Sequence, residues 1–169
     1  MKIESARNCT YFTYESELGR FTVVSDGSAI LSVKVGDIAD PPGAVYKADA
    51  LTDWAARQLD EYFKRERREF DIPLNPKGTN FQLSVWDALK KIPYGETRSY
   101  KQIAQTINNP NACRAVGMAN NKNPIWIIIP CHRVIGASGE LTGYGGGLDM
   151  KQRLLDIESN HPALRATLR

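Results

Sequence analysis

The order of hydrophobic and polar positions changes its period part-way along the chain. In the first part, residues 11–14, 20–24 and 29–35 are rich in β-branched and aromatic side chains, with turn-forming residues between them. This pattern predicts three strands connected by short turns. Apolar residues then recur at helical spacing from about Asp49 to Arg67, which predicts an amphipathic helix. Residues 70–74 are typical of one more short strand.

The second part of the chain is predicted to be mainly helical. Thr79 and Ser99 each precede an apolar run at helical spacing, and each has a glutamine three residues later, which is the pattern of a capping box. A third helix is expected from near Asn111, after the helix-breaking sequence Asn108-Asn-Pro. Two short helices around a tight turn are typical of a helix-turn-helix, but two amphipathic helices packed as a plain hairpin have the same pattern.

A linker at Asn75-Pro-Lys-Gly separates these two patterns. We therefore expect an α+β chain of two domains. Residues 1–75 form a small antiparallel sheet with a helix, and residues 76–169 form a mainly helical domain that contains the helix-turn-helix. A length of 169 residues, with 42% hydrophobic and 24% charged residues, suits a soluble globular protein with room for two small cores.

Charge and cysteine content narrow the functional classes only slightly. The net charge of +3 permits nucleic-acid binding without arguing for it. Cysteines at positions 9, 113 and 131 form neither a disulfide framework nor a CxxC metal pattern, and their odd number favours a reducing compartment. The N-terminus lacks an apolar signal segment, and no stretch reaches the length of a membrane span. We expect a cytoplasmic protein that does not bind a membrane.

The stretch Ile127-Ile-Ile-Pro-Cys-His-Arg-Val-Ile135 carries the strongest chemical signal. Its apolar run is expected to be a buried strand or extended segment that Pro130 ends, so that Cys131 emerges at the mouth of a site. A thiol becomes a nucleophile when a nearby base such as His132 helps it to ionise. A small buried hydrophobic role for the cysteine is also common, and adjacent strand residues point to opposite faces.

A glycine-rich loop and a last helix follow this stretch. Six of the twelve residues 136–147 are glycine, which permits close approach of a ligand to the backbone but also suits a plain tether. Asp149 and Gln152 are expected to cap the helix, and Glu158 shares a helical face with Leu154 and Leu155. A carboxylate on an apolar face needs a partner. His132 is one candidate, and a solvated glutamate near the helix end is the alternative.

The exposed face of the helix that follows Asn111 is suited to nucleic acid. Arg114, Gly117, Met118 and Asn121 lie together at helical spacing. The small residues Ala115 and Gly117 would let a nucleic-acid backbone approach closely, with Arg114 projecting between them.

Taken together, four sequence blocks resemble the O6-alkylguanine-DNA alkyltransferases, also called methylated-DNA–protein-cysteine methyltransferases. The resemblance is strong over about residues 78–158 and rests on these blocks: Arg114-Ala-Val-Gly117, Asn123-Pro, Pro130-Cys-His-Arg-Val134 and Gly143-Tyr-x-Gly-Gly147. It implies an RNase H-like N-terminal domain. It also implies repair of double-stranded DNA, in which the damaged nucleotide is flipped out and the alkyl group of O6-alkylguanine, or of O4-alkylthymine, moves irreversibly to Cys131.

The resemblance also implies roles for individual residues. Cys131 is the alkyl acceptor, His132 takes its proton through a water, and Glu158 orients that histidine. Tyr100 rotates a phosphate and donates a hydrogen bond to the leaving guanine, and Arg114 fills the gap left by the flipped nucleotide. The other expected contacts with DNA are Lys101, Ala115, Gly117 and Asn121, and those with the base pocket are Asn123, Val134, Tyr144 and Gly145. No cofactor or metal is implied, and the protein is expected to act as a monomer, with cooperative binding along DNA left open.

Some features depart from the family pattern. Trp126 stands where relatives commonly carry a small residue or proline, and Gly145–Gly147 makes the hairpin barer. The N-terminal half has no histidine, so the zinc site of some relatives is not expected.

Two other functions remain open from the residues alone. A cysteine hydrolase would use Cys131, His132 and Glu158 to turn over esters or peptides. A DNA-binding module without chemistry would need only residues 97–121. Neither needs the Pro-Cys-His-Arg-Val block, which favours the alkyltransferase.

Overall fold

The computed structural model describes residues 9–36 and 38–159. The chain divides into two compact units between Lys77 and Gly78, and each unit is described by itself. The sequence places the domain boundary two residues earlier.

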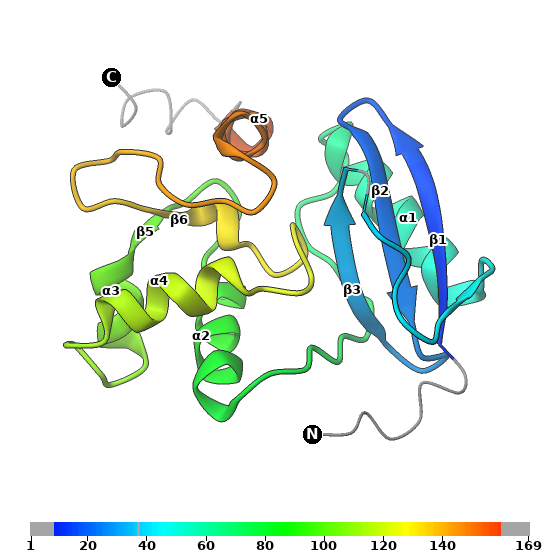
Figure 1. Ribbon diagram of the computed structural model, residues 1–169. Helices are drawn as coiled ribbons and strands as arrows, with labels where there is room; N and C mark the ends of the chain where they lie inside the picture. Colours follow the sequence, from blue (N-terminus) through cyan, green and yellow to red (C-terminus); the bar gives the residue numbers. More distant parts are fainter. Residues whose placement is uncertain (1–8, 37, 160–169) are drawn as a thin grey trace. The chain divides into compact units, whose positions relative to one another are not determined.

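The N-terminal unit is a four-stranded sheet in the order β3-β2-β1-β4. Figure 1 labels the first three of these strands. Strand β1 (Thr10–Ser16) pairs antiparallel with β2 (Gly19–Ser25), and β2 pairs antiparallel with β3 (Ile30–Val35). These are the three strands that the runs of β-branched and aromatic residues predict. The two-residue edge strand β4 (Val45–Tyr46) runs parallel to β1 and was not predicted, because two residues are too few to show a period.

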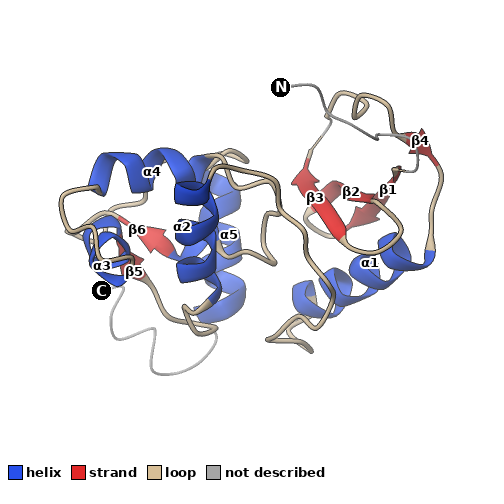
Figure 2. Cartoon of the chain, turned by 90° about the horizontal axis from the view of Figure 1, so that it is seen from below, coloured by secondary structure: helices blue, strands red, loops and turns tan. Residues whose placement is uncertain are grey.

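Helix α1 (Ala50–Phe63) packs against one face of this sheet (Figure 2). The core between them includes Val23, Val33 and Leu59, all fully buried. The helix ends four residues before the expected Arg67, because Arg65 takes a left-handed backbone conformation with φ of 62° and the charged run offers no apolar face to bury.

Residues 70–74 do not form the expected strand. Only Leu74 makes a bridge, to Ile30, with Ile30 donating to the Pro73 carbonyl at 2.9 Å. Pro73 has no N–H of its own, so a regular ladder cannot continue through it.

The C-terminal unit is mainly helical, as expected. Its helices are α2 (Asn80–Lys90), α3 (Tyr100–Thr106), α4 (Cys113–Asn121) and α5 (Leu148–Ser159). A parallel pair of two-residue strands, β5 (Arg98–Ser99) and β6 (Val134–Ile135), lies among them. The predicted capping boxes are present at the starts of α2 and α3. The predicted cap of α5 is wrong, since the helix begins at Leu148 and Asp149 lies in its first turn.

Helices α2, α3 and α4 pack against one another around buried apolar residues. The Trp86 indole on α2 is 1% exposed, and its N–H donates to the Ala119 carbonyl on α4 at 2.9 Å. This bond ties the helix-turn-helix to the rest of the unit. Within the part of the chain that the structure describes, no helix has the length and apolar character needed to span a membrane.

Candidate active site

The segment before Cys131 is buried as expected, but it is not a strand. Ile127 has a φ of 73°, and the Ile128 N–H donates to the Trp126 carbonyl at 2.8 Å. These two features describe a tight γ-turn, which is strained for a β-branched residue. At Pro130 a second tight turn follows, in which the Cys131 N–H donates to the Ile129 carbonyl at 2.8 Å. The segment therefore reverses direction twice before it reaches Cys131.

Two buried asparagine side chains hold these turns in place. The Asn123 amide donates to the Ile129 carbonyl at 2.8 Å, and its oxygen accepts from the Ile125 N–H at 3.0 Å. The Asn120 amide donates to the Cys131 carbonyl at 3.3 Å. Side chains thus satisfy backbone groups that a strand would have paired with a neighbouring strand.

Cys131 opens a short 3-10 turn, η1 (Cys131–Arg133), rather than ending a strand. Its side chain is buried, with 3% of the residue exposed. His132 is completely buried, and its Nε2 lies 2.7 Å from Glu158 Oε1 on helix α5. The expected partner of Glu158 is therefore the one found, and the alternative of a solvated glutamate is wrong.

Glu158 is held by more than the histidine. Arg133 donates from Nε and Nη2 to the two carboxylate oxygens, each at 2.9 Å, and its Nη1 donates to the Ile92 carbonyl at 2.6 Å. The Gly95 N–H adds a bond at 3.3 Å. Such a two-pronged guanidinium–carboxylate contact fixes orientation as well as charge.

The electrostatics of this cluster follow from burial and from Arg133. Burial lowers the pKa of His132, and the neighbouring Glu158 opposes that shift. Burial alone would raise the pKa of Glu158, but charge and hydrogen bonds from His132 and Arg133 outweigh it and hold the pKa well below the ordinary value. Because Arg133 stays charged, Glu158 is ionised even when His132 is neutral. A neutral histidine beside an anion can accept a proton.

Tyr144, in the glycine-rich loop, also lies near Cys131. Burial, together with the nearby Cys131, raises the pKa of Tyr144 well above its ordinary value. Among the residues that the structure describes, its buried hydroxyl has no hydrogen-bond partner. The ring of Tyr144 lies 5.5 Å from that of Trp126, tilted by 45°. Val134, also expected at the pocket, is fully buried at the start of β6.

The residues expected to contact DNA lie together on the helix-turn-helix. Arg114, Ala115 and Asn121 are exposed on α4, and Lys101 is exposed on α3. A side chain at Gly117 would come within 3.7 Å of the Tyr100 ring, which places the small residue of α4 directly over α3. The Tyr100 hydroxyl donates to the Thr142 carbonyl at 3.2 Å, linking α3 to the glycine-rich loop.

Known proteins have the same two parts. Residues 80–160 match the family model of the 6-O-methylguanine DNA methyltransferase DNA-binding domain, and residues 9–76 match that of its ribonuclease-like domain. The chain belongs to the 6-O-methylguanine DNA methyltransferase family. The resemblance drawn from the sequence blocks is confirmed, as is the expected fold class.

Individual relatives cover nearly the whole chain. The methylated-DNA–protein-cysteine methyltransferase of Methanosarcina acetivorans is 49% identical over 153 residues, which are 89% of this chain and 98% of that protein. The protein of the same name from Mycolicibacterium paratuberculosis is 47% identical over 94% of this chain and 97% of its own length. The solved structure of Mycobacterium tuberculosis OGT in complex with DNA is 48% identical, has a TM-score of 0.84, and matches 89% of this chain and 92% of that chain.

The sequence did not indicate a role for two basic residues near the cysteine of this methyltransferase family member. Arg133 is part of the Pro-Cys-His-Arg-Val motif, but its hydrogen bonds to Glu158 become apparent only in the folded structure. Lys151 is fully buried, and its ammonium donates to the carbonyls of Val134 and Thr142 at 2.5 and 2.8 Å. Burial lowers the pKa of Lys151 to about 8, and the nearby Cys131 opposes that shift. The sequence could have indicated that Lys151 is buried, because Lys151 shares a helical face with Leu154, Leu155 and Glu158.

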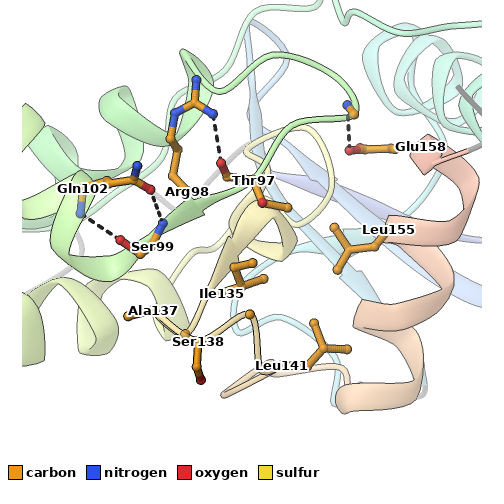
Figure 3. Close-up of a pocket in the computed structure, with 13 residues that line it drawn as sticks. Thr97, Arg98, Ser99, Gln102, Ile135, Ala137, Ser138, Leu141, Leu155 and Glu158 are labelled. Carbon is orange, nitrogen blue, oxygen red and sulfur yellow. Dashed lines mark hydrogen bonds between the residues drawn. The ribbon is translucent and has the colours of Figure 1, made fainter. Parts of the chain in front are cut away.

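One hollow of this unit adjoins Glu158 rather than Cys131 (Figure 3). It is lined by the N-terminal end of α3, the start of the glycine-rich loop and helix α5, and its lining includes Gln102, Ile135 and Leu155 but not the cysteine. Among the described residues, no group of three or more His, Cys, Asp and Glu side chains could hold a metal ion.

Proposed function

We propose that this protein repairs alkylated double-stranded DNA by moving the alkyl group from O6 of guanine, and from O4 of thymine, to Cys131, once per molecule. The observation that carries this proposal is the buried contact of 2.7 Å between His132 and Glu158. His132 lies in the same 3-10 turn as Cys131. Family membership supplies the reaction class, and the cluster supplies the residues that would perform it.

The first step is removal of the thiol proton. A free cysteine has a pKa of about 8.5, so a base is needed near neutral pH. His132, neutral because it is buried, takes the proton from Cys131 through a water, and the anionic Glu158 stabilises the imidazolium that forms. Arg133 keeps Glu158 ionised and oriented.

The second step is displacement at the alkyl carbon. The Cys131 thiolate forms a bond to that carbon while the bond from the carbon to guanine O6 breaks. The electron pair leaves with guanine, whose anion receives a proton donated by Tyr100. The proton held on His132 balances the one that Tyr100 gives up. The thioether is chemically inert, and no described residue near it could remove the alkyl group, so each molecule reacts once.

DNA binding uses the exposed face of α4. Turning a nucleotide out of the stack costs a few kcal/mol, and less for a badly paired lesion. Arg114 fills the gap that is left, while Ala115 and Gly117 allow close approach of the duplex. Phosphate contacts, including those of Lys101 and Asn121, do not depend on sequence, which suits damage that occurs anywhere. Because Cys131 is 3% exposed, entry of the base requires a local rearrangement over the sulfur.

The proposal also covers the base pocket, the domain that acts, the oligomeric state and the cellular location. Val134, Tyr144 and Gly145 line the pocket, and Asn123 orders the turn beneath it. We place DNA binding and chemistry in the domain 76–169, acting as a monomer. A cytoplasmic location keeps the thiol reduced.

Mass spectrometry tests the proposal directly. The protein is incubated with a duplex containing O6-methylguanine, and its peptides are analysed. We expect one methylene's worth of added mass on the Cys131 peptide, absent in Cys131→Ser. Addition to Cys9 or Cys113, or no addition, would overturn the assignment. Multiple turnovers on esters without a permanent mass change would instead support a cysteine hydrolase, and DNA binding without either reaction would support a binding module.

A further inference from the structure

We propose that Asn120 accepts a hydrogen bond from the 2-amino group of the flipped guanine and thereby makes the protein select guanine lesions over thymine lesions. This inference rests on the proposed function and names the base that the same site prefers. Asn120 lies on the buried face of α4, whereas Arg114 and Met118 are exposed on that helix.

The side chain of Asn120 is fixed beside the reacting cysteine. Asn120 is 2% exposed, and its amide nitrogen donates to the Cys131 carbonyl at 3.3 Å. Because a carbonyl oxygen can only accept, this bond also fixes which end of the amide is its oxygen. The preceding residue, Ala119, is held through its carbonyl by the Trp86 indole at 2.9 Å. Asn120 is therefore positioned both by its side chain and by the backbone next to it.

The oxygen of this amide is a buried acceptor without a donor. Among the residues that the structure describes, Asn120 Oδ1 has no hydrogen-bond partner, and leaving a buried polar atom unpaired is costly. Acceptors around it are already engaged. The Cys131 carbonyl accepts from Asn120 and from the Val134 N–H, and the Val134 carbonyl accepts from Lys151. Asn120 Oδ1 therefore remains available next to the cysteine.

The two candidate bases differ in what they offer to such an acceptor. The edge of guanine that carries O6 also carries the 2-amino donor, whereas the edge of thymine that carries O4 also carries the O2 acceptor. A base that presents its alkylated oxygen to Cys131 presents the rest of that edge to the side chains bonded to Cys131, and Asn120 is one of them. The Asn120 oxygen would bind guanine and repel thymine.

A buried acceptor of this kind can discriminate strongly. A site built to accept a hydrogen bond rejects an analogue without the donor, because the acceptor is then left buried and unpaired. A water molecule could satisfy the same oxygen, but a bound water would not make the reaction depend on the 2-amino group. Substrates that differ only in this group therefore distinguish the two donors.

The first experiment uses wild-type protein and three duplexes, which carry O6-methylguanine, O6-methylhypoxanthine or O4-methylthymine. O6-Methylhypoxanthine is the guanine lesion without its 2-amino group. We expect it to alkylate Cys131 about tenfold more slowly than O6-methylguanine, and O4-methylthymine to be slower still. Because the hypoxanthine lesion pairs less well, it is easier to flip, so flipping does not account for a slower reaction. Equal rates for the guanine and hypoxanthine lesions would overturn the proposal.

The second experiment repeats these rates with Asn120→Leu, which removes the acceptor and also the donor to the Cys131 carbonyl. We expect slower reaction with every duplex, but the guanine and hypoxanthine lesions should now react at about equal rates. Asn120→Ala should do the same. Gln152→Leu, a similar change at an exposed position of α5, should keep the wild-type rate ratio. A slower Asn120→Leu variant that keeps this ratio would show a purely structural role and overturn the proposal.

Binding separates this proposal from the proposed function. Cys131→Ser, which lacks the thiol, should bind the O6-methylguanine duplex several-fold more tightly than the O6-methylhypoxanthine duplex. Adding Asn120→Leu should remove the difference. Wild-type protein that transfers no alkyl group from any duplex would overturn the proposed function, and the affinities of Cys131→Ser would still test the acceptor. Equal affinities of Cys131→Ser for the two duplexes would overturn the role of Asn120.

Discussion

At the scale of single residues, we propose that the reactivity of Cys131 depends on the charges that are buried around it. Arg133 helps to keep Glu158 ionised at neutral pH, and the charge of Glu158 favours protonation of His132 despite its burial. The sequence could predict Cys131, His132 and Glu158, because a motif and one helical face single them out. The sequence could not predict that Arg133 binds Glu158 or that Lys151 binds the Val134 and Thr142 carbonyls, since those contacts join residues on different elements.

The charge of Glu158 should govern the rate. We expect Glu158→Gln to slow alkylation by about a hundredfold, because a positioned base contributes factors of this order and a neutral amide stabilises the imidazolium less. Single-turnover kinetics on an O6-methylguanine duplex measures the effect. Asp156→Asn, an exposed carboxylate change on the same helix, should react at the wild-type rate. A Glu158→Gln variant that is folded and equally fast would contradict the relay.

The same substitution should change how stability depends on pH. The folded pKa of Glu158 lies below its ordinary value of 4.5, so its stabilisation is complete above that pH and is lost as the pH falls below it. Removing a buried charge partner costs about 3 kcal/mol, and we expect that loss at pH 7. Urea unfolding from pH 7 to pH 3 should show the difference from wild type shrinking on acidification. A constant difference would contradict the pairing.

Lys151 should matter for rate more than for stability at neutral pH. The folded pKa of Lys151 is about 8, below its ordinary value of 10.5, so its protonated form is disfavoured by folding at neutral pH and the penalty fades as the pH rises from about 8 to 10.5. Because methionine leaves the Val134 and Thr142 carbonyls without this donor but removes the penalty on the charge, we expect Lys151→Met to destabilise the protein less at pH 7 than at pH 10. We also expect it to alkylate roughly tenfold more slowly. Calorimetry and single-turnover kinetics check this, with the exposed Arg153→Met as control. An unchanged alkylation rate in Lys151→Met would contradict a role for Lys151 in the reaction.

At the scale of secondary-structure elements, features set by neighbouring residues could be predicted from the sequence, whereas features set by tertiary contacts could not. Both capping boxes of the helical unit were predictable, because they depend on residues three apart. The apolar run before Pro130 was predicted to be a strand or an extended segment, but it forms tight turns. Isoleucines favour strands, but the side chains of Asn120 and Asn123 hold this run in tight turns. Only the folded chain brings those amides and carbonyls together.

Helix α4 should determine how the protein handles duplex DNA. We expect Arg114→Ala to slow repair of an O6-methylguanine duplex about tenfold or more, because the flipped state loses the side chain that fills the gap. Reaction with free O6-benzylguanine should change little, since no base must be flipped. Arg68→Ala removes one positive charge from the N-terminal unit and should affect neither. Equal losses on both substrates would contradict the role of Arg114.

The start of α2 offers a test of the capping argument. The Thr79 hydroxyl accepts from the Gln82 N–H at 3.2 Å, so Thr79→Ala should lower the free energy of unfolding by about 1 kcal/mol. Chemical denaturation measures it. Thr106→Ala removes a hydroxyl that bonds only back within its own helix, to the Gln102 carbonyl, and should cost less than half as much. An equal loss of unfolding free energy in both variants would show that the Thr79 cap does not stabilise the protein more than an ordinary hydroxyl within a helix.

At the scale of the whole molecule, the chain joins a sheet-and-helix unit to a unit that holds all the proposed chemistry. Both were predictable in outline, because the hydrophobic period changes from that of strands to that of helices near residue 75. In the proposed function, the molecule acts as a reagent rather than as a recycling catalyst. Its stoichiometry, and not its rate, is therefore the property that distinguishes it from a hydrolase.

A titration with excess damaged duplex tests this most directly. Wild-type protein is mixed with increasing amounts of an O6-methylguanine duplex, and repaired DNA and alkylated protein are both counted. We expect repair to stop at one lesion per protein molecule, with every alkyl group on Cys131 and none transferred by Cys131→Ser. Repair that continues beyond one equivalent, or alkyl groups found on Cys9 or Cys113, would contradict the account.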